Sequence, residues 1–331
     1  MFDKIVIVTK KTRVQELEQK FNQVAQAKFY IENSGQSFHI YQQAHDNYFR
    51  AIEEIRKLIP GDVKYQYIDR DFLPNFLFGE KDLVVTIGPD GLVINTAKYL
   101  TNQPILALNP DPERIDGIMI PFNLTDLKKS IVKVFDGKFA TKSISMAKAR
   151  LNDGQELFGV NDLFIGANSH VSFRYNLNYS GQSELQSSSG IIISTGAGST
   201  GWFKSVVNGA RGIWSKYNPM PENTESVSKT KKKSRKKDGN KKNGEIDTAF
   251  PWDSKYLYFS IREPFPSKVS GVKLVFGMID ASNPLTIESN MPQGGVIFSD
   301  GIQKDFLEFN SGKTAQISVA GKSAVLITGV V

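Results

Sequence analysis

Residues 82–91, DLVVTIGPDG, decide the fold of this 331-residue chain. A β-branched apolar run ends abruptly in Gly-Pro-Asp-Gly, and residues 92–100 continue with helical character. A buried parallel strand that ends in a tight turn before a helix is how α/β proteins present polar groups to a ligand. Backbone N–H groups at such a helix start favour phosphate, and Asp90 would lie at the carboxyl end of the strand. The alternative is an ordinary Pro-Asp-Gly turn without a ligand.

Strand and helix patterns alternate around this stretch. Short apolar runs predict further buried strands at residues 4–9, 63–68 and 104–108. Helices are predicted at residues 45–58, at 92–100, and from residue 14, with Val14, Leu17, Phe21 and Val24 on one face. The connection over residues 29–41 has no clear pattern. We therefore expect residues 1–123 to form an open, doubly wound α/β domain that binds nucleotides at its strand ends.

The pattern changes after Phe122. An amphipathic helix is predicted at residues 124–135, and a second helix at about 200–214. Between and after them come short apolar strands, predicted at 159–165, 171–177, 190–194, 256–261, 272–276, 285–288 and 296–299. This density of strands predicts a β-rich, sandwich-like domain over residues 124–331. The sequence leaves open whether the last strands, residues 315–331, return to the first domain.

One low-complexity insertion dominates the charge of the chain. The net charge is +7, but residues 229–242, KTKKKSRKKDGNKK, contribute +8, so the remainder is close to neutral. Residues 219–247 are rich in Lys, Asn, Ser and Gly with almost no apolar side chains, which predicts a disordered loop. A nucleic-acid arm is the alternative for this tract, but no aromatic residues interleave the lysines to stack on bases.

The composition excludes several classes of site. The chain has no cysteine, so it has no disulfide, thiolate metal site or cysteine nucleophile. Its three histidines lack metal-ligand spacing, and no carboxylate cluster predicts a dedicated metal site. No apolar run is long enough to span a bilayer. The absence of a basic, Ser-rich presequence leads us to expect a cytoplasmic, bacterial protein.

Two further segments carry polar groups in a pattern that suits a ligand. Asn161 and Asp162 stand at the start of a predicted strand, where an ordinary Asx turn is the alternative. Residues 194–202, STGAGSTGW, lead from a strand through a Gly/Ser/Thr loop towards a helix. Hydroxyl and helix N–H groups suit phosphate or ribose oxygens, and Trp202 offers a flat face to a base. A helix cap by Ser199 or Thr200 is the alternative for this loop.

In this order the three segments resemble the NAD kinase family. Its signature is a GGDG loop, then an Asn-acid pair, then a TGST-type loop. The chain has GPDG at 88–91, Asn161-Asp162, and TGAGST at 195–200. Residues 10–13, 109–114 and 260–264 are similar to the branch that contains the mitochondrial NAD kinases. The resemblance spans most of the chain except the lysine-rich insertion.

This resemblance implies transfer of the γ-phosphoryl group of ATP to the 2′-hydroxyl of the adenosine ribose of NAD or NADH. Asp90 matches the family aspartate and would be the general base, because a carboxylate can accept the hydroxyl proton. Mg²⁺ would arrive bound to ATP. The resemblance places phosphate at Gly88, Gly91, Lys10, Thr12 and Arg13, although a solvated helix start is an alternative for the last three. It places NAD at Asn161, Asp162, Thr195, Gly198, Ser199, Thr200, Trp202 and Ser205. Family members are commonly homodimers or tetramers.

Three departures from the family pattern bear on this interpretation. Pro89 replaces the second glycine of GGDG and removes one backbone N–H. Leu92 replaces the usual Thr, and Trp202 stands where many members have Tyr. A non-catalytic NAD(H)-binding protein is therefore the main alternative function. Lipid and sugar kinases, which share GGDG-like loops, are another, but Asn161-Asp162 and the 195–202 segment favour NAD.

Overall fold

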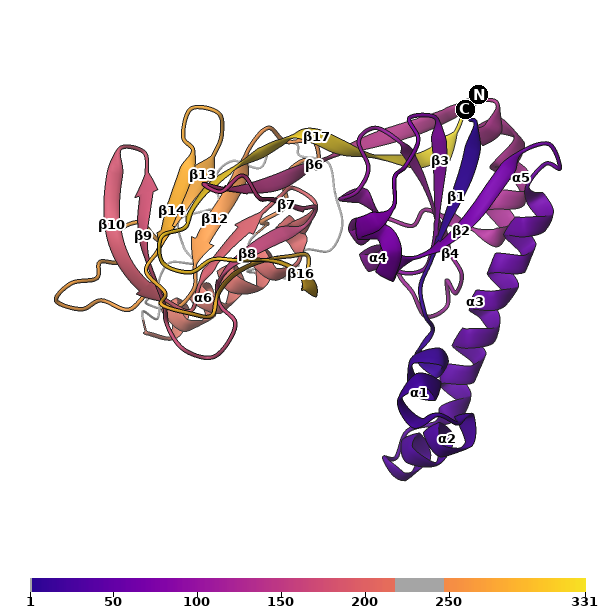
Figure 1. Ribbon diagram of the computed structural model, residues 1–331, viewed down its shortest axis with the longest axis horizontal. Coiled ribbons are helices and arrows are strands. Elements are labelled where there is room, and N and C mark those ends of the chain that lie inside the picture. The colour runs from indigo at the N-terminus through magenta and orange to yellow at the C-terminus, as the bar shows by residue number, and fades with distance from the viewer. Residues whose placement is uncertain (1, 218–246) are drawn as a thin grey trace, which may run out of the picture.

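A parallel sheet with helices on both faces forms the N-terminal part of the computed structural model, which describes residues 2–217 and 247–331 (Figure 1). The strand order is β2 (Lys64–Asp69), β1 (Lys4–Thr9), β3 (Asp82–Ile87) and β4 (Pro104–Asn109), with the short β5 (Phe122–Asn123) beside β4. Helices α3 (Phe38–Leu58) and α5 (Leu124–Phe135) cover one face, and α4 (Asp90–Ala97) covers the other. This is the doubly wound α/β domain that the sequence predicts.

Alternate side chains of each strand enter two separate cores. Ile5 and Ile7 of β1 face α3 and α5, whereas Val6 and Val8 face α4. Successive residues of a strand point to opposite faces, so a sheet covered on both sides needs apolar residues at every position. The unbroken apolar runs in the sequence follow from this burial.

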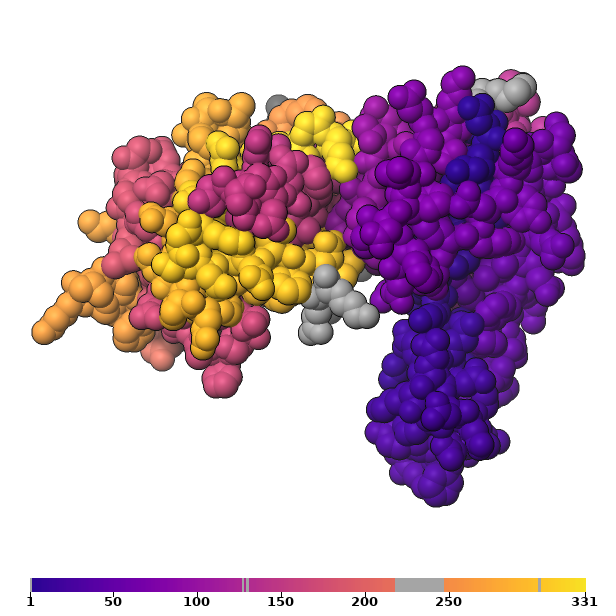
Figure 2. Space-filling model, viewed as in Figure 1, coloured from indigo at the N-terminus to yellow at the C-terminus, as the bar shows by residue number. Residues whose placement is uncertain are grey.

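An arm of helices projects from the α/β domain below the carboxyl ends of its strands (Figures 1 and 2). It consists of α1 (Arg13–Phe21), α2 (Val24–Asn33) and the first half of α3. The predicted continuation of the first helix through Val24 was wrong, and residues 29–41, which had no clear pattern, prove to be mostly helical. Asn22 adopts a left-handed conformation (φ 61°) and ends α1, so Val24 begins a new helix. Most of residues 29–41 is helical, because Ala27, Ile31 and Phe38 pack with Val14 and Leu17 in a small core.

The C-terminal part is a sandwich of two largely antiparallel sheets. One contains β7 (Glu156–Gly159), β9 (Phe173–Tyr179), β10 (Gln182–Ser188) and β14 (Leu285–Ser289). The other has the order β13 (Phe276–Ile279), β12 (Leu257–Ile261), β11 (Ile191–Ser194), β8 (Asp162–Ala167), β15 (Gly295–Ser299) and β16 (Ile302–Glu308). Their inner faces share one core, in which Tyr175 and Phe259 are fully buried. A strand predicted at 272–276 instead begins at Phe276.

Two long strands join the two parts (Figure 1). The antiparallel pair β6 (Phe139–Leu151) and β17 (Thr314–Val330) begins in the sandwich sheet and ends beside the parallel sheet, where Leu326 of β17 pairs with Ile105 of β4. The sequence showed no pattern for β6. The last strand thus lies in the same hydrogen-bonded sheet as β1. The predicted disordered insertion, residues 219–247, lies almost entirely outside the described residues.

Candidate active site

The carboxyl ends of three parallel strands bring one glycine and two cations side by side. Thr9 of β1 pairs with Asp69 of β2, and Val8 pairs with Thr86 of β3. Lys10 and Arg70 come one residue after the first pair, and Lys10 and Gly88 come two residues after the second, so continued register places Arg70, Lys10 and Gly88 in a row at the carboxyl ends of these strands. Only Lys10 and Gly88 were predicted from the sequence; the signal for Arg70 was its position directly after a neighbouring strand.

The Gly-Pro-Asp-Gly stretch joins β3 directly to α4. Gly88 has φ +150°, a conformation that side chains disfavour, and its N–H donates to the carbonyl of Leu108 on β4 at 3.1 Å. Pro89 is the N-cap of α4, and the helix begins at Asp90. The first N–H groups of a helix, here those of Asp90 and Gly91, lack partners within it, and helix starts of this kind favour anions. The stretch is a strand-to-helix junction and not a free-standing turn.

Asp90 holds the loop that follows β4. Its two carboxylate oxygens accept the backbone N–H groups of Ile118 and Met119, each at 2.9 Å. The same loop is fixed by Asn109, whose side chain donates to the carbonyl of Ile115 at 2.8 Å. Asp90 is half-buried and keeps lone pairs beyond these two bonds, because each carboxylate oxygen can accept two hydrogen bonds.

Lys10 lies against the glycine of this junction. A Cβ at position 88 would lie 3.2 Å from Leu92 Cδ2 and 3.8 Å from Lys10 Cδ, so the Gly88 backbone lies next to both side chains. Burial, and then the charge of Arg70, lower the pKa of Lys10. No carboxylate lies within ion-pair distance of its ammonium group in the part of the chain that the structure describes. Arg70 pairs with Asp71 at 3.8 Å, so Lys10 is the cation without an acid, and an unpaired ammonium beside a guanidinium favours an anionic ligand.

Thr12 and Arg13, predicted beside Lys10, have local partners. Thr12 is the N-cap of α1 in a capping box with Gln15, and its hydroxyl lies 2.7 Å from His45 Nδ1. Arg13 is exposed and pairs with Glu16 at 3.0 Å. In this structure the contacts of Thr12 and Arg13 are therefore those of an ordinary helix start, the alternative to phosphate binding.

Asn161 and Asp162 lie at the start of β8, above the core that also buries α4. Val160 and Ala197 pack in the same core as Leu92 and Ala97 of α4, so one hydrophobic cluster supports the Asn161-Asp162 segment, the 195–200 loop and α4. The Asn161 Oδ1 atom is buried and has no hydrogen-bond partner among the described residues. Burial, and then the charge of Asp300, raise the pKa of Asp162 to about 7.

The loop at residues 195–200 packs on Asn161 through its backbone. Thr195 donates from its N–H to the Asn161 carbonyl at 2.9 Å and from its hydroxyl to the Val160 carbonyl at 2.5 Å. A Cβ on Gly198 would lie 2.1 Å from that carbonyl oxygen, and one on Gly196 would lie 1.9 Å from the Pro251 carbonyl oxygen. The buried hydroxyl of Ser199 donates to the Gly196 carbonyl at 2.6 Å. These glycines are required by protein packing, whether or not a ligand approaches them.

Trp202, at the start of α6 (Trp202–Tyr217), forms one wall of an open pocket beside this loop. Its ring stacks on Phe164 with centroids 5.6 Å apart, and the Arg262 guanidinium lies 5.5 Å above it. The pocket has a volume of about 890 Å³ and includes Asp162 and His170. Thr200 and Ser205 are exposed nearby, at the η2 turn (Gly198–Thr200) and on α6. An aromatic face, a cation and a carboxyl group together suit a base and its ribose.

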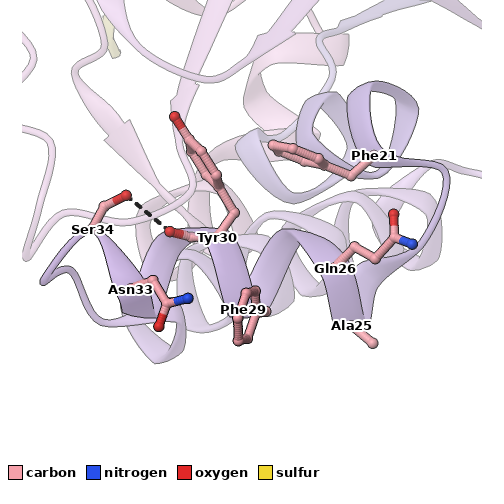
Figure 3. A pocket seen from close by; sticks show the side chains of 7 residues that line it. All are labelled: Phe21, Ala25, Gln26, Phe29, Tyr30, Asn33 and Ser34. Carbon is pink, nitrogen blue, oxygen red and sulfur yellow. Dashed lines mark hydrogen bonds between the residues drawn. The ribbon is translucent and has the colours of Figure 1, made fainter.

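The arm carries a separate, more apolar hollow, which Figure 3 shows in close view. Its lining residues are Phe21, Ala25, Gln26, Phe29, Tyr30, Asn33 and Ser34. The rings of Phe21 and Tyr30 lie 5.0 Å apart. None of the residues predicted to bind nucleotide lines this hollow.

Comparison with solved structures identifies the architecture. An NAD kinase from Archaeoglobus fulgidus, solved with ATP, matches 98% of this chain and 93% of its own, with a TM-score of 0.54 and 13% identity. The yeast NADH kinase, solved with NADH, matches 99% of this chain and 84% of its own, with a TM-score of 0.58 and 14% identity. The chain has the NAD kinase fold. The fold class expected from the sequence is thereby confirmed, and so is the resemblance to NAD kinases, but the mitochondrial branch is not singled out.

Sequence comparison points the same way. NAD kinases from several strains of Saccharolobus islandicus are 22% identical over 157 residues, which is 47% of this chain. The chain spans 57% of the length of these curated relatives. No protein-family model matches the chain. Within residues 2–217 and 247–331, no helix is both long and apolar enough to cross a membrane.

Proposed function

We propose that this protein is an NAD(H) kinase that transfers the γ-phosphoryl group of ATP to the 2′-hydroxyl of the adenosine ribose of NAD or NADH. The observation that carries the proposal is the row of Arg70, Lys10 and Gly88 at the carboxyl ends of β2, β1 and β3, next to Asp90. The fold that holds this row is shared with two kinases, one solved with ATP and one with NADH. Phosphoryl transfer depends mainly on positioning and on neutralising phosphate charge. Lys10 and Arg70 would neutralise the phosphate charge, and the N–H groups at the start of α4 would position the phosphates.

In this proposal Asp90 is the general base. As the ribose oxygen bonds to the γ-phosphorus, the bond from that phosphorus to the β–γ bridging oxygen breaks and ADP leaves. The hydroxyl proton passes to the Asp90 carboxylate. The N–H groups of Ile118 and Met119 orient that carboxylate. Mg²⁺ enters as part of the MgATP substrate.

The triphosphate would lie over Gly88 and Gly91, with its charge balanced by Lys10 and Arg70. A Cβ on Gly91 would meet nothing within 4 Å, so no protein contact accounts for a glycine at that position. Close approach of a phosphate to the backbone would account for it. Thr12 and Arg13 complete the proposed phosphate-binding segment. Thr12 caps the start of α1 and so fixes the chain after Lys10, and Arg13 adds a positive charge.

The dinucleotide would lie in the pocket between Asp162 and Trp202. The unpartnered Asn161 Oδ1 would accept a hydrogen bond from the ligand, because a buried acceptor without a donor is costly. Exposed Thr200 and Ser205 would add hydroxyl contacts. Thr195, Gly198 and Ser199 would shape the loop, since their polar atoms and backbone already contact neighbouring main chain.

The test is turnover by the purified protein. ATP, Mg²⁺ and either NAD or NADH are incubated with the protein, and NADP(H) is measured for the wild type and for Asp90→Asn. We expect wild-type turnover and a loss of about 10²–10⁴-fold in the variant, the range typical of a lost general base. Nucleotide binding, measured by calorimetry, should survive the substitution. Turnover that persists at the wild-type rate in Asp90→Asn would exclude Asp90 as the base.

A non-catalytic NAD(H)-binding protein is the second candidate. Two observations favour it: Pro89 lacks the N–H of the family glycine, and both Asp90 oxygens already accept backbone N–H groups. Dinucleotide binding without turnover from ATP or polyphosphate would establish this candidate and exclude the kinase.

We further propose a homo-oligomer, a dimer or tetramer, in the cytoplasm, with nucleotides and not nucleic acid as ligands. Support for the oligomer comes only from resemblance to the family. Light scattering coupled to gel filtration tests it, and a mass equal to one chain would contradict it.

A further inference from the structure

A buried lysine lies at the far end of the helix that begins with Asp90. Lys98 directly follows α4 and is 4% exposed. Its ammonium group donates to Ser299 Oγ at 2.6 Å and to Asp305 Oδ2 at 2.5 Å, and it lies 3.8 Å from Asp300 Oδ2. Ser299 ends β15, and Asp305 lies on β16. α4 of the α/β domain is thereby tied to a hairpin of the sandwich.

Asp300 in turn holds the Asn-acid segment through its main chain. Its Oδ1 accepts the N–H groups of Asn161 at 2.7 Å and Asp162 at 3.2 Å, and its Oδ2 accepts the N–H of Val160 at 3.0 Å. The N–H of Asp300 donates back to the Asp162 carbonyl at 3.1 Å. One carboxylate thus fixes three successive residues, in the manner of an anion in a nest of N–H groups.

Stability alone is a weak reason for such an arrangement. Replacing a buried ion pair by apolar residues of similar volume is often neutral or stabilising, because the ions lose their hydration. Asp300 and Gly301 have φ +52° and +69°, the ordinary backbone of a two-residue Asp-Gly hairpin turn between β15 and β16, so the turn accounts for the backbone conformation. The turn does not account for the burial of the carboxylate against Lys98 and three N–H groups, and a buried charge held in this way is expected where its direction serves a site.

We propose that Asp300, paired with Lys98, is a positioning residue that orients Asn161 and Asp162 towards the dinucleotide and ties them to the helix that carries Asp90. The inference rests on the proposed function, because it takes Asn161 and Asp162 as ligand contacts. The connected path runs from Asp90 along α4 to Lys98, and from there through Asp300 to Asp162.

The charge of Asp300 gives this role a measurable signature. Burial raises the pKa of Asp300, whereas Lys98 and the three N–H groups oppose that rise. After burial, the charge of Asp300 is the second cause that raises the pKa of Asp162. The other titratable or charged groups around Asp162, on the hairpin, the pocket walls and α4, are Asp305, His170, Arg262 and Lys98.

The variant Asp300→Asn tests the proposal, with Asp305→Asn as the matched control. Asp305 also pairs with Lys98 but makes none of the bonds to residues 160–162. The titration of the Asp162 carboxyl is followed by carbon NMR, assigned with Asp162→Asn, and NADH binding is followed by fluorescence from pH 5.5 to 8.5. In Asp300→Asn we expect the Asp162 midpoint to fall, because the charge that adds to the effect of burial is removed, and NADH affinity to drop at least tenfold. In Asp305→Asn we expect affinity to change less than threefold.

A folded Asp300→Asn protein with an unchanged Asp162 midpoint and unchanged NADH affinity would overturn the proposal. If that variant does not fold, Lys98→Met carries the test, with an expected fivefold or greater loss of NADH affinity and an unchanged KM for ATP. Unchanged NADH affinity in Lys98→Met would overturn the proposal equally. The NMR titration needs no ligand. It therefore tests the coupling between Asp300 and Asp162 even if the wild type shows no kinase activity.

Discussion

Gly198 lies so close to the Asn161 main chain that no side chain fits between them. A Cβ there would meet a carbonyl oxygen at 2.1 Å, and this atom is backbone that cannot rotate away. We expect Gly198→Ala to lower the free energy of unfolding by about 3 kcal/mol, at the upper end of the cost of overpacking, and to weaken NAD(H) binding by displacing Asn161. Urea denaturation and calorimetry measure the two effects.

Gly209 on α6 is the matched control, because its Cβ would meet nothing within 4 Å. Gly209→Ala should leave binding unchanged and stabilise the helix by up to about 1 kcal/mol. Equal effects of the two substitutions would contradict the packing argument for the 195–200 loop.

The junction between β3 and α4 is the element in which this chain departs most from the family pattern. Pro89 has φ −74° at the N-cap, a conformation that glycine and alanine also adopt. Pro89→Gly therefore restores a backbone N–H at the proposed phosphate site at a stability cost of about 1 kcal/mol. We expect kcat/KM for ATP to rise severalfold, because an added donor stabilises phosphate charge.

The matched control for this junction is Pro89→Ala, which restores the same N–H without the flexibility of glycine. Both variants should gain activity if the N–H group matters. A gain in Pro89→Gly alone would assign the effect to backbone flexibility, and no gain in either would show that the N–H at position 89 plays no part in catalysis.

At the scale of the whole molecule, the last strand stabilises a domain that begins more than 300 residues earlier. Leu326 is 1% exposed and packs in the core beside α4, next to β4. We expect Leu326→Ala to cost about 3 kcal/mol of unfolding free energy, within the range for a buried leucine. Hydrogen exchange of the β4 amides should accelerate with it, because β17 pairs with that strand.

Val331, 77% exposed, provides the comparison at the same end of the chain. Val331→Ala should change stability by less than about 0.5 kcal/mol. A Leu326→Ala protein in which only the sandwich loses protection from exchange would contradict the shared core.

Local patterns in the sequence determined much of this architecture. The apolar runs at β1, β3 and β4 can be recognised as strands from their own residues alone, because both faces of the parallel sheet are buried and each run has apolar side chains on both faces. The order GPDG, Asn161-Asp162 and TGAGST was sufficient for the resemblance to NAD kinases. Helix α5 was predicted with its observed bounds, because its amphipathic pattern is regular.

Only the tertiary structure decided which distant residues meet. Arg70 joins Lys10 through strand register, and Lys98 joins Asp300 across 202 positions of the chain, at spacings that no local pattern encodes. β6 is part exposed and part buried along its length, so it lacks the alternation that marks a strand. The sequence by itself determined the elements and the residue types of the site. Packing between distant segments determined the charges around Asp162, because burial and neighbouring charges exist only in the folded chain.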